Sequence, residues 1–348
     1  MNRSYAFQTT LERYGVGDYE EYRIPALAVT DKQTVVTAYE ARKEAGNDWA
    51  ETDIAVRRSV DGGKSFETPC FPGSTLKNIF PDAVTFNNPV LTADGERLHL
   101  IFCLDYARVF YCCSDDEGVS FSVPREITEC FNGFHWDWNV CAAGPGHGIV
   151  TGSGRMLVPV WLAKGEIRDE TGRVKNHFPS RAACIYSDDH GESWKRGTMA
   201  EGIENASETT VAELKDGRIL FNFRNERYEK CRVLGIWDTC MDHLSEVWTE
   251  LGLVDPTCFG SMASYGGEIF FVNCANRDPA RLYGPRLNLT VYRSTDPHHW
   301  VPEFLADARG GYSDIGVNEH GIWVFYEKGN TVEGKNIVGE LVVKKWDF

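Results

Sequence analysis

Three arginines stand at the ends of strand-like segments, where their side chains could converge on a small anion. Arg23 and Arg286 each precede an apolar run, and Arg224 follows one. Guanidinium groups bind carboxylates through charge-assisted, often paired hydrogen bonds. The chain has a formal net charge of −15, so a cluster of arginines within it indicates an anion pocket. The alternative is that Arg23 or Arg286 pairs with a surface carboxylate at a strand end.

The acidic balance of the chain also limits its partners. Nucleic acids and anionic membranes favour a basic surface, and we expect neither as a partner. The segment Met1–Pro25 lacks the apolar core of a secretory signal, and nowhere do 18 apolar residues run together. We therefore expect a soluble protein of the cytoplasm.

Eleven cysteines are scattered along the chain without any Cys-x-x-Cys spacing. Their positions on strand-like runs predict small buried thiols in a reducing compartment. This pattern disfavours a disulfide framework and a zinc site. We expect no metal and no cofactor.

A short pattern, Ser-x-Asp-x-Gly-x-Ser followed by Phe or Trp, occurs at Ser59–Phe66, Ser114–Phe121 and Ser187–Trp194. Each copy follows a strand-like apolar run and therefore predicts a hairpin turn. The glycine supplies a positive φ, the Ser and Asp side chains bond local backbone, and the aromatic ring is buried between sheets. Three separate ligand sites are the alternative, which these local roles disfavour.

The spacing of the three copies predicts a repeated fold. Their starts lie 55 and 73 residues apart, which suggests a unit of roughly 50 to 60 residues and about six units in the chain. A degenerate fourth copy occurs at Ser294–Trp300. Six four-stranded sheets arranged radially form a β-propeller. We predict an all-β, six-bladed β-propeller that occupies residues 1–348 as a single domain, with a helical turn or two only near Asp242–Trp248.

Together with these turns, which are Asp boxes, the arginine motifs resemble the exo-α-sialidase (neuraminidase) family. Its members are six-bladed propellers with Asp-box turns and an arginine triad. Arg23–Pro25 is similar to the family's opening Arg-Ile-Pro, and Gly144–His147 and Met156–Trp161 look like further landmarks. The resemblance covers essentially the whole chain. It implies a triad of Arg23, Arg224 and Arg286.

The resemblance also implies three catalytic side chains. Tyr312, in a Gly-Tyr-Ser-Asp-Ile stretch, matches the family's nucleophilic tyrosine. Glu208, sixteen residues before Arg224, matches its catalytic glutamate. Asp48, six residues after Arg42, matches its acid/base aspartate.

Two of these assignments have structural alternatives. Asp53 lies five residues after Asp48 and could compete for the acid/base role. Because Asp53 begins a strand-like run, we expect it to face a structural partner instead. Tyr312 could be a packed aromatic residue at the rim.

The chemistry of sialic acid explains why these residue types would converge. Its anomeric carbon bears a carboxylate, which three arginines can hold and orient. That carboxylate would repel a carboxylate nucleophile but not a neutral tyrosine, and sialidases are the tyrosine exception among glycosidases. Glu208 would take the proton of Tyr312, while Asp48 protonates the leaving oxygen and later activates water. The implied activity is a retaining exo-α-sialidase that releases terminal sialic acid from glycoconjugates or oligosaccharides through a tyrosyl-glycosyl intermediate.

The resemblance further implies contacts with the rest of the sugar. Arg42 is expected on the 4-hydroxyl side, unless it only pairs with Glu40 or Asp48. Asn87 stands in the region that builds part of the family's N-acyl pocket, where some relatives have an aspartate or a methionine. Trp161 could stack on the substrate or close a blade.

Three other functions fit the same scaffold. One is hydrolysis of a related sugar acid such as Kdn or Kdo, which Asn87 and the short segment 101–113 suggest. Another is transfer of the sugar to an acceptor other than water. The third is a sialic-acid-binding propeller without catalysis, which the presence of Tyr312 disfavours. The aromatic segment Phe134–Trp138 could line the rim or pack in the core, and the sequence sets no oligomeric state.

Overall fold

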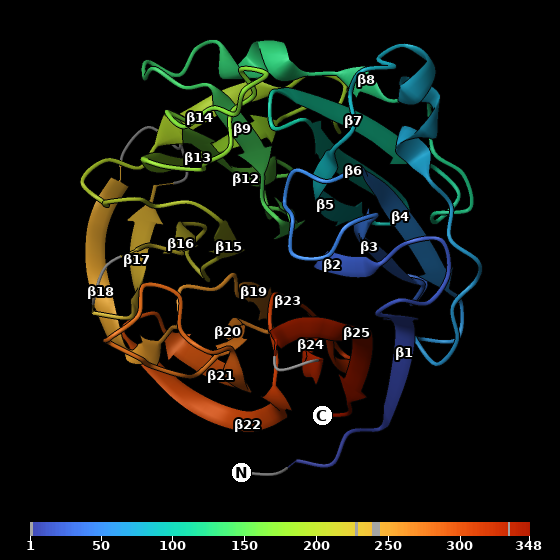
Figure 1. The fold of residues 1–348 in the computed structure, drawn as a ribbon. Helices are drawn as coiled ribbons and strands as arrows, with labels where there is room; N and C mark the ends of the chain where they lie inside the picture. The colour runs from blue at the N-terminus through green and yellow to red at the C-terminus, as the bar shows by residue number, and fades with distance from the viewer. Residues whose placement is uncertain (1–2, 227–228, 239–243, 333–334) are drawn as a thin grey trace.

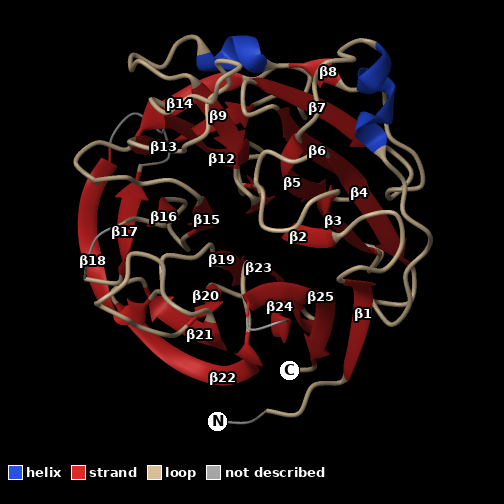
Figure 2. Ribbon diagram, viewed as in Figure 1, coloured by secondary structure: helices blue, strands red, loops and turns tan. Residues whose placement is uncertain are grey.

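The computed structural model describes residues 3–226, 229–238, 244–332 and 335–348. Within these residues the strands form six β-sheets, arranged like blades around a central axis (Figures 1 and 2). The predicted all-β, six-bladed β-propeller is therefore confirmed. Successive blades follow one another around the ring in chain order, as the ribbon colours show (Figure 1).

Each blade is built mainly from consecutive antiparallel strands. The first blade contains β2 (Glu21–Val29), β3 (Val35–Arg42) and β4 (Thr52–Ser59). The second contains β5 (Phe86–Asp94), β6 (Arg97–Leu104), β7 (Arg108–Ser114), β8 (Arg125–Glu126) and β10 (Gly146–His147). The third contains β9 (Val140–Ala143), β11 (Ile149–Val150), β12 (Met156–Ala163), β13 (Ser180–Ser187) and β14 (Lys195–Met199).

The other three blades complete the ring. The fourth contains β15 (Thr209–Glu213), β16 (Ile219–Phe223), β17 (Cys231–Trp237) and β18 (Leu244–Val254). The fifth contains β19 (Ser261–Tyr265), β20 (Glu268–Cys274), β21 (Leu287–Asp296) and β22 (His299–Arg309). The sixth contains β1 (Phe7–Arg13), β23 (Ser313–Asn318), β24 (Gly321–Val332) and β25 (Lys335–Trp346). Two 3₁₀ helices, η1 (Pro72–Asn78) and η2 (Thr128–Phe131), lie between strands.

The two ends of the chain close the ring. β1 pairs antiparallel with β25, from Phe7 opposite Lys345 to Arg13 opposite Glu340. The sixth blade thus takes its outermost strand from the start of the chain and its other strands from the end. Radial closure of this kind leaves only short sheet edges exposed.

The three Asp boxes are turns whose polar groups bond one another. In the first, the Ser59 hydroxyl donates to Asp61 (2.7 Å) and accepts from the N–H of Gly63 (2.8 Å). Ser65 donates to Asp61 from its N–H (2.9 Å) and its hydroxyl (2.6 Å). The same four bonds recur in the other two copies. The predicted hydrogen-bonded turn is therefore confirmed in all three copies, whereas the predicted burial of the closing ring holds only for Trp194, because Phe66 and Phe121 are half-buried.

The helical turn predicted near Asp242–Trp248 is wrong for the part that the structure describes. Residues 244–248 begin β18, whereas Asp242 lies outside the described residues. Trp248 pairs across the sheet with Leu234 of β17, and Val247 pairs with Gly235. Strand pairing has overridden local preference here, as tertiary context commonly does.

A buried ion pair near the centre of the ring joins inner strands of four blades. The Asp314 carboxylate, on β23, lies 2.6 Å from Nδ1 of His147 on β10. It also accepts hydrogen bonds from the Ser261 hydroxyl on β19 (2.5 Å) and the Leu27 N–H on β2 (2.7 Å). Burial lowers the pKa of His147, but Asp314 outweighs burial and raises that pKa above its ordinary value.

We expect Asp314→Asn to lower the free energy of unfolding by about 3 kcal/mol near pH 6, because breaking a buried ion pair leaves its partner uncompensated. The pKa of His147 is raised above its unfolded value of about 6.5. The pair therefore stabilises fully below that value, and its contribution is lost as the pH rises through the folded pKa. The effect of the substitution should shrink at about pH 9.

Urea titrations at both pH values measure this effect. Asp188→Asn serves as the control, because Asp188 pairs with Arg155 at the surface. An unchanged urea midpoint for Asp314→Asn near pH 6 would contradict the stabilising role of the pair.

Candidate active site

The structure brings the three sequence-predicted triad arginines together around the ring of Tyr312. The guanidinium carbons of Arg23, Arg224 and Arg286 lie 5.3, 5.8 and 4.9 Å from the ring centroid. Arg23 lies on β2, Arg224 directly follows β16, and Arg286 directly precedes β21. Three different blades therefore position one cationic cluster.

A buried carboxylate on β24, Glu327, holds two of these arginines. It accepts hydrogen bonds from Nε of Arg23 (2.9 Å) and Nη2 of Arg23 (3.2 Å), and it lies 3.4 Å from Nη1 of Arg286. It also accepts the backbone N–H groups of Ile24 and Tyr312, each at 3.1 Å. Burial raises the pKa of Glu327, but Arg23 and Arg286 outweigh burial and lower it below its usual range. Glu327 is thus an ionised anchor for the cluster.

The Arg-Ile-Pro motif turns Arg23 toward the cluster through a backbone irregularity. Ile24 has a φ of +59°, and the β2–β3 register shifts between Arg23 and Ala26. A β-branched residue at positive φ is strained by about 1–3 kcal/mol and needs support from its surroundings. The N–H of Ile24 finds this support in Glu327, and Pro25 has no N–H that would need a ladder partner.

Tyr312 and Glu208 form a buried hydrogen-bonded pair. The Tyr312 hydroxyl donates to Oε1 of Glu208 at 2.7 Å, and the two residues are 6% and 7% exposed. Nη1 of Arg224 donates to both side chains. Burial raises the pKa of Tyr312 well above its ordinary value, Glu208 raises it further, and Arg224 opposes both. Tyr312 is therefore a neutral phenol whose proton already points at a carboxylate.

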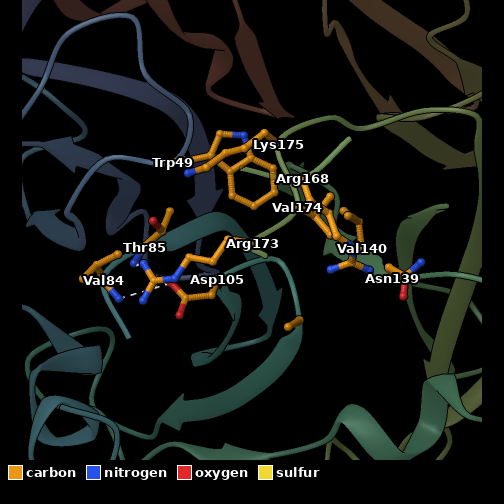
Figure 3. A pocket seen from close by; sticks show the side chains of 11 residues that line it. Trp49, Val84, Thr85, Asp105, Asn139, Val140, Arg168, Arg173, Val174 and Lys175 are labelled. Atoms are coloured by element: carbon orange, nitrogen blue, oxygen red, sulfur yellow. Dashed lines mark hydrogen bonds between the residues drawn. The ribbon is translucent and has the colours of Figure 1, made fainter. Parts of the chain in front are cut away.

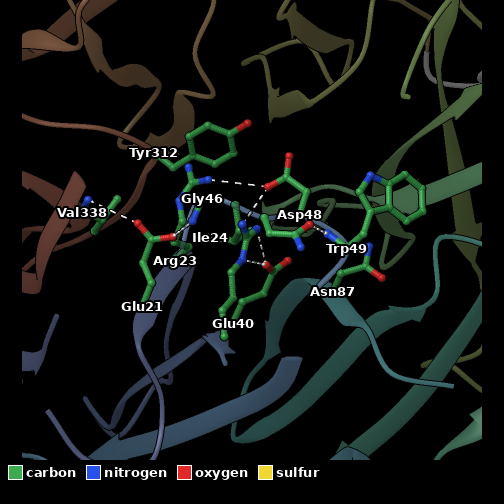
Figure 4. A network of polar contacts seen from close by, with 12 residues as sticks. Glu21, Arg23, Ile24, Glu40, Gly46, Asp48, Trp49, Asn87, Tyr312 and Val338 are labelled. Atoms are coloured by element: carbon green, nitrogen blue, oxygen red, sulfur yellow. Dashed lines mark hydrogen bonds and ion pairs between the residues drawn. The ribbon is translucent and has the colours of Figure 1, made fainter. Parts of the chain in front are cut away.

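Asp48 reaches the same cluster from the loop between β3 and β4. Its Oδ1 lies 2.7 Å from Nη1 of Arg42 and 3.7 Å from Nη1 of Arg23, and Figure 4 shows it between Arg23 and Trp49. Its side chain is 45% exposed, so a ligand can reach it. Burial raises the pKa of Asp48, but Arg42 and then Arg23 outweigh burial and hold it well below its usual range.

The competing aspartate, Asp53, is occupied by structural partners. It lies 2.7 Å from the ammonium group of Lys77 and accepts a hydrogen bond of 2.7 Å from the hydroxyl of Tyr19. These contacts match the structural role expected for Asp53. Asp48 is the aspartate that the structure places beside the arginines.

Arg42 is buried and holds Asp48 in place. Its guanidinium group donates to Oε2 of Glu40 at 2.8 and 2.6 Å and to Asp48 at 2.7 Å. Glu40 in turn accepts the N–H of Asn88 at 2.8 Å. Both pairings weighed for Arg42 therefore occur. Its contact with a ligand stays a prediction.

Asn87 and Trp161 are buried rather than at an open surface. Asn87 is fully buried, donates to Oδ1 of Asn88 (2.8 Å) and accepts from the N–H of Tyr106 (3.4 Å). Trp161 is also buried, and its ring centroid lies 6.2 Å from that of Tyr106 and 5.4 Å from that of His177. Substrate contacts of Asn87 and Trp161 stay predictions.

The aromatic segment Phe134–Trp138 packs against η2. Phe134 is buried, and the centroids of Phe134 and Trp138 lie 5.9 and 6.4 Å from that of Phe131. Trp136 instead lies under the guanidinium group of Arg181 at 5.2 Å. Of the two alternatives for this segment, the structure supports packing in the core: Phe134 belongs to a core cluster, and Trp136 and Trp138 pack against it.

Sequence reasoning missed Glu327 and a group of three aromatic residues beside Asp48. Glu327 directly follows the apolar run Ile322–Tyr326, and a charge at the end of such a run was the available signal. Trp49, Tyr106 and His177 come from separate loops and pack against one another, with centroids 4.6 to 5.1 Å apart. No sequence pattern links them. Among the described residues, no group of three His, Cys, Asp or Glu side chains could hold a metal ion.

We expect Glu327→Gln to release the backbone that Glu327 holds. Glutamine keeps the shape but loses the charge that holds Arg23, so the Ile24 and Tyr312 amide hydrogens should exchange about 10-fold faster or more. Hydrogen-exchange mass spectrometry measures this change. Glu340→Gln is the matched control, because Glu340 pairs with Arg13 and Lys328 nearer the surface. Unchanged exchange at Ile24 and Tyr312 would contradict the anchoring role.

Comparisons with known proteins agree with this fold. Residues 81–324 match the model of the BNR repeat-like domain family. A sialidase of Bacteroides fragilis is 28% identical over 88% of this chain and 60% of its own length. Rat sialidase-2 is 26% identical over 89% of both chains. The chain thus spans less than two thirds of the Bacteroides protein.

Solved structures show the same fold. Hadza microbial sialidase Hz136 superposes with a TM-score of 0.77 at 19% identity, over 95% of this chain and 66% of its own. The intramolecular trans-sialidase of Ruminococcus gnavus, solved with oseltamivir carboxylate, gives a TM-score of 0.72 at 15% identity over 100% and 97%. Fold and arginine cluster define a sialidase-like propeller. The chain belongs to the BNR repeat-like domain family, and the curated sialidases named above are similar to it.

Proposed function

We propose that the protein is a retaining exo-α-sialidase that hydrolyses terminal sialic acid from glycans through a covalent intermediate on Tyr312. The observation that carries the proposal is the buried Tyr312–Glu208 hydrogen bond inside the ring of three arginines. The sialidase relatives support the same activity. We infer that residues 1–348 form one catalytic domain.

The arginines account for recognition of the sugar acid. Arg23, Arg224 and Arg286 would bind the carboxylate on the anomeric carbon through charge-assisted hydrogen bonds. Arg286 is the most available of the three, because its side chain is 32% exposed and its carboxylate contact with Glu327 is the longer one, at 3.4 Å. Fixing this carboxylate would set the anomeric carbon above the Tyr312 hydroxyl.

In the first step, the Tyr312 oxygen attacks the anomeric carbon as the bond to the leaving oxygen breaks. The phenolic proton passes to Glu208, and Asp48 gives its proton to the leaving oxygen. In the second step, Asp48 takes a proton from water, which attacks the same carbon. The bond to Tyr312 breaks, and the phenolate recovers its proton from Glu208. Two displacements give net retention.

Asp48 must be protonated for the first step, although its pKa is low in the free site. Arg23 contributes to that low pKa, and Arg23 would also bind the substrate carboxylate. A substrate carboxylate would offset the charge of Arg23 and so raise the pKa of Asp48. Substrate binding would in this way favour protonation of Asp48.

Three further residues would help to bind the remainder of the sugar. We infer that Arg42 contacts the 4-hydroxyl side and that Asn87 and Trp161 shape the acyl end. Hydrolysis of Kdn or Kdo and transfer to another acceptor use the same steps with a different sugar or acceptor. The ten described cysteines are free thiols, which supports a reducing compartment such as the cytoplasm. None of the helices among the described residues is long and apolar enough to span a membrane.

The test is release of 4-methylumbelliferone from α-glycosides of N-acetylneuraminic acid and of its deaminated analogue. Tyr312→Phe should lower kcat by about 10³-fold or more, because the nucleophile is lost, while affinity for free N-acetylneuraminic acid is largely kept. Arg286→Ala should weaken that affinity by about 10- to 100-fold, the cost of a charge-assisted hydrogen bond.

Tyr186→Phe is the matched control, because Tyr186 is half-buried on β13 beside Arg155. Full activity in Tyr312→Phe would overturn the proposed mechanism. Binding without turnover by the wild type would indicate a lectin-like propeller instead.

A further inference from the structure

A cavity of about 250 Å³ lies beside the loop that carries Asp48 (Figure 3). Trp49 forms one wall, and apolar side chains such as Val84 and Val174 form others. Trp49 directly follows Asp48 in the chain, so this cavity and the arginine cluster share one loop. The roles proposed above for the arginine cluster leave the cavity unused.

Three cations line this cavity. Arg168, Arg173 and Lys175 come from the connection between β12 and β13, and Asp105 is the only carboxylate among the described lining residues. The lining thus has an excess of two positive charges in a chain whose formal net charge is −15. A local excess of this sign raises the local concentration of anionic ligands.

The hydrogen bonds of these cations leave their charges largely free to act on a ligand. Arg168 donates to the backbone carbonyl of Gly172 (2.9 Å), and Arg173 donates to that of Asp82 (3.2 Å). Lys175 has a carboxylate partner, Asp169, at 3.5 Å, but its side chain stays 33% exposed. Backbone carbonyls orient a guanidinium group without neutralising it.

Trp49, on the loop that carries Asp48, offers a flat aromatic face near the cations. The ammonium group of Lys175 lies 5.3 Å from the Trp49 ring centroid, and the ring of His177 stacks with that of Trp49 at 5.1 Å. A sugar ring can pack on an aromatic face of this kind while its charged substituent contacts a nearby cation. Figure 3 shows Lys175 next to Trp49 and Arg173 next to Asp105.

We propose that this cavity is a subsite for the leaving group and that it favours aglycones with an anionic substituent, such as a carboxylate or a sulfate on the sugar next to the terminal sialic acid. The inference rests on the proposed function, because it needs Asp48 as the acid. Since Asp48 would protonate the leaving oxygen, the aglycone begins at Asp48. Trp49 then directs it toward Arg173 and Lys175.

The test compares three substrates of the intact protein. One is sialyllactose, whose aglycone is neutral. The other two have an anionic aglycone: an α2,8-linked disialyl glycan, and sialyllactose sulfated on its galactose. Release of sialic acid is measured by chromatography at low salt and at about 0.5 M NaCl. We expect kcat/KM to be about 5- to 10-fold higher on the anionic substrates at low salt, since one or two exposed ion pairs give effects of this size. High salt should remove the preference because it screens exposed charges.

The double variant Arg173→Gln/Lys175→Gln should bring the ratio of anionic to neutral kcat/KM to about one. Lys164→Gln is the matched control: Lys164 begins the same connection but lies over Trp136, and it should keep the wild-type ratio. Preference for the disialyl glycan alone would assign the subsite to a carboxylate, and preference for the sulfated one alone to a sulfate.

A wild-type ratio near one, or a ratio that the double variant leaves unchanged, would overturn the subsite while leaving the proposed function intact. If Tyr312→Phe still hydrolysed sialyllactose as fast as the wild type, the proposed function itself would be overturned, and the subsite with it.

Discussion

Glu327 holds two arginines and two backbone amides at the junction of the first and sixth blades. Without this buried carboxylate, Arg23 and Arg286 would repel each other, and the positive φ of Ile24 would lose its support. The ring closure by β1 and β25 fixes the blade from which Glu327 projects. The geometry of the arginine cluster therefore depends on one buried carboxylate.

Two other carboxylates of the site are each paired with an arginine. Glu208 is bound to Arg224 and Asp48 to Arg42, so the free site is close to electrically balanced. In this state burial raises the pKa of Tyr312, which keeps its proton, whereas Arg42 and Arg23 outweigh burial and lower the pKa of Asp48, which does not. A bound carboxylate would shift this balance at Arg23, which links recognition of the anion to protonation of the acid.

The sequence predicts the parts of this structure that depend on local chemistry. The Asp boxes repeat one turn and so reveal the blades, and Arg-Ile-Pro marks a bulge where proline needs no ladder bond. Glu327 and the packed aromatic residues Tyr106 and His177 cannot be found by such reasoning, because only the closed propeller brings them to the site. The helical turn predicted up to Trp248 fails for a similar reason, since pairing with β17 decides the conformation of that segment.

The central claim is that Tyr312 forms a covalent bond to the sugar. Incubation with a 2,3-difluorinated sialic acid, which slows hydrolysis of such an intermediate, followed by proteolysis and mass spectrometry, locates the bond. The account predicts a single sialyl adduct on the peptide that carries Tyr312, and none on that peptide in Tyr312→Phe. An adduct on Glu208 or Asp48, or no adduct in an enzyme that turns over its substrate, would contradict it.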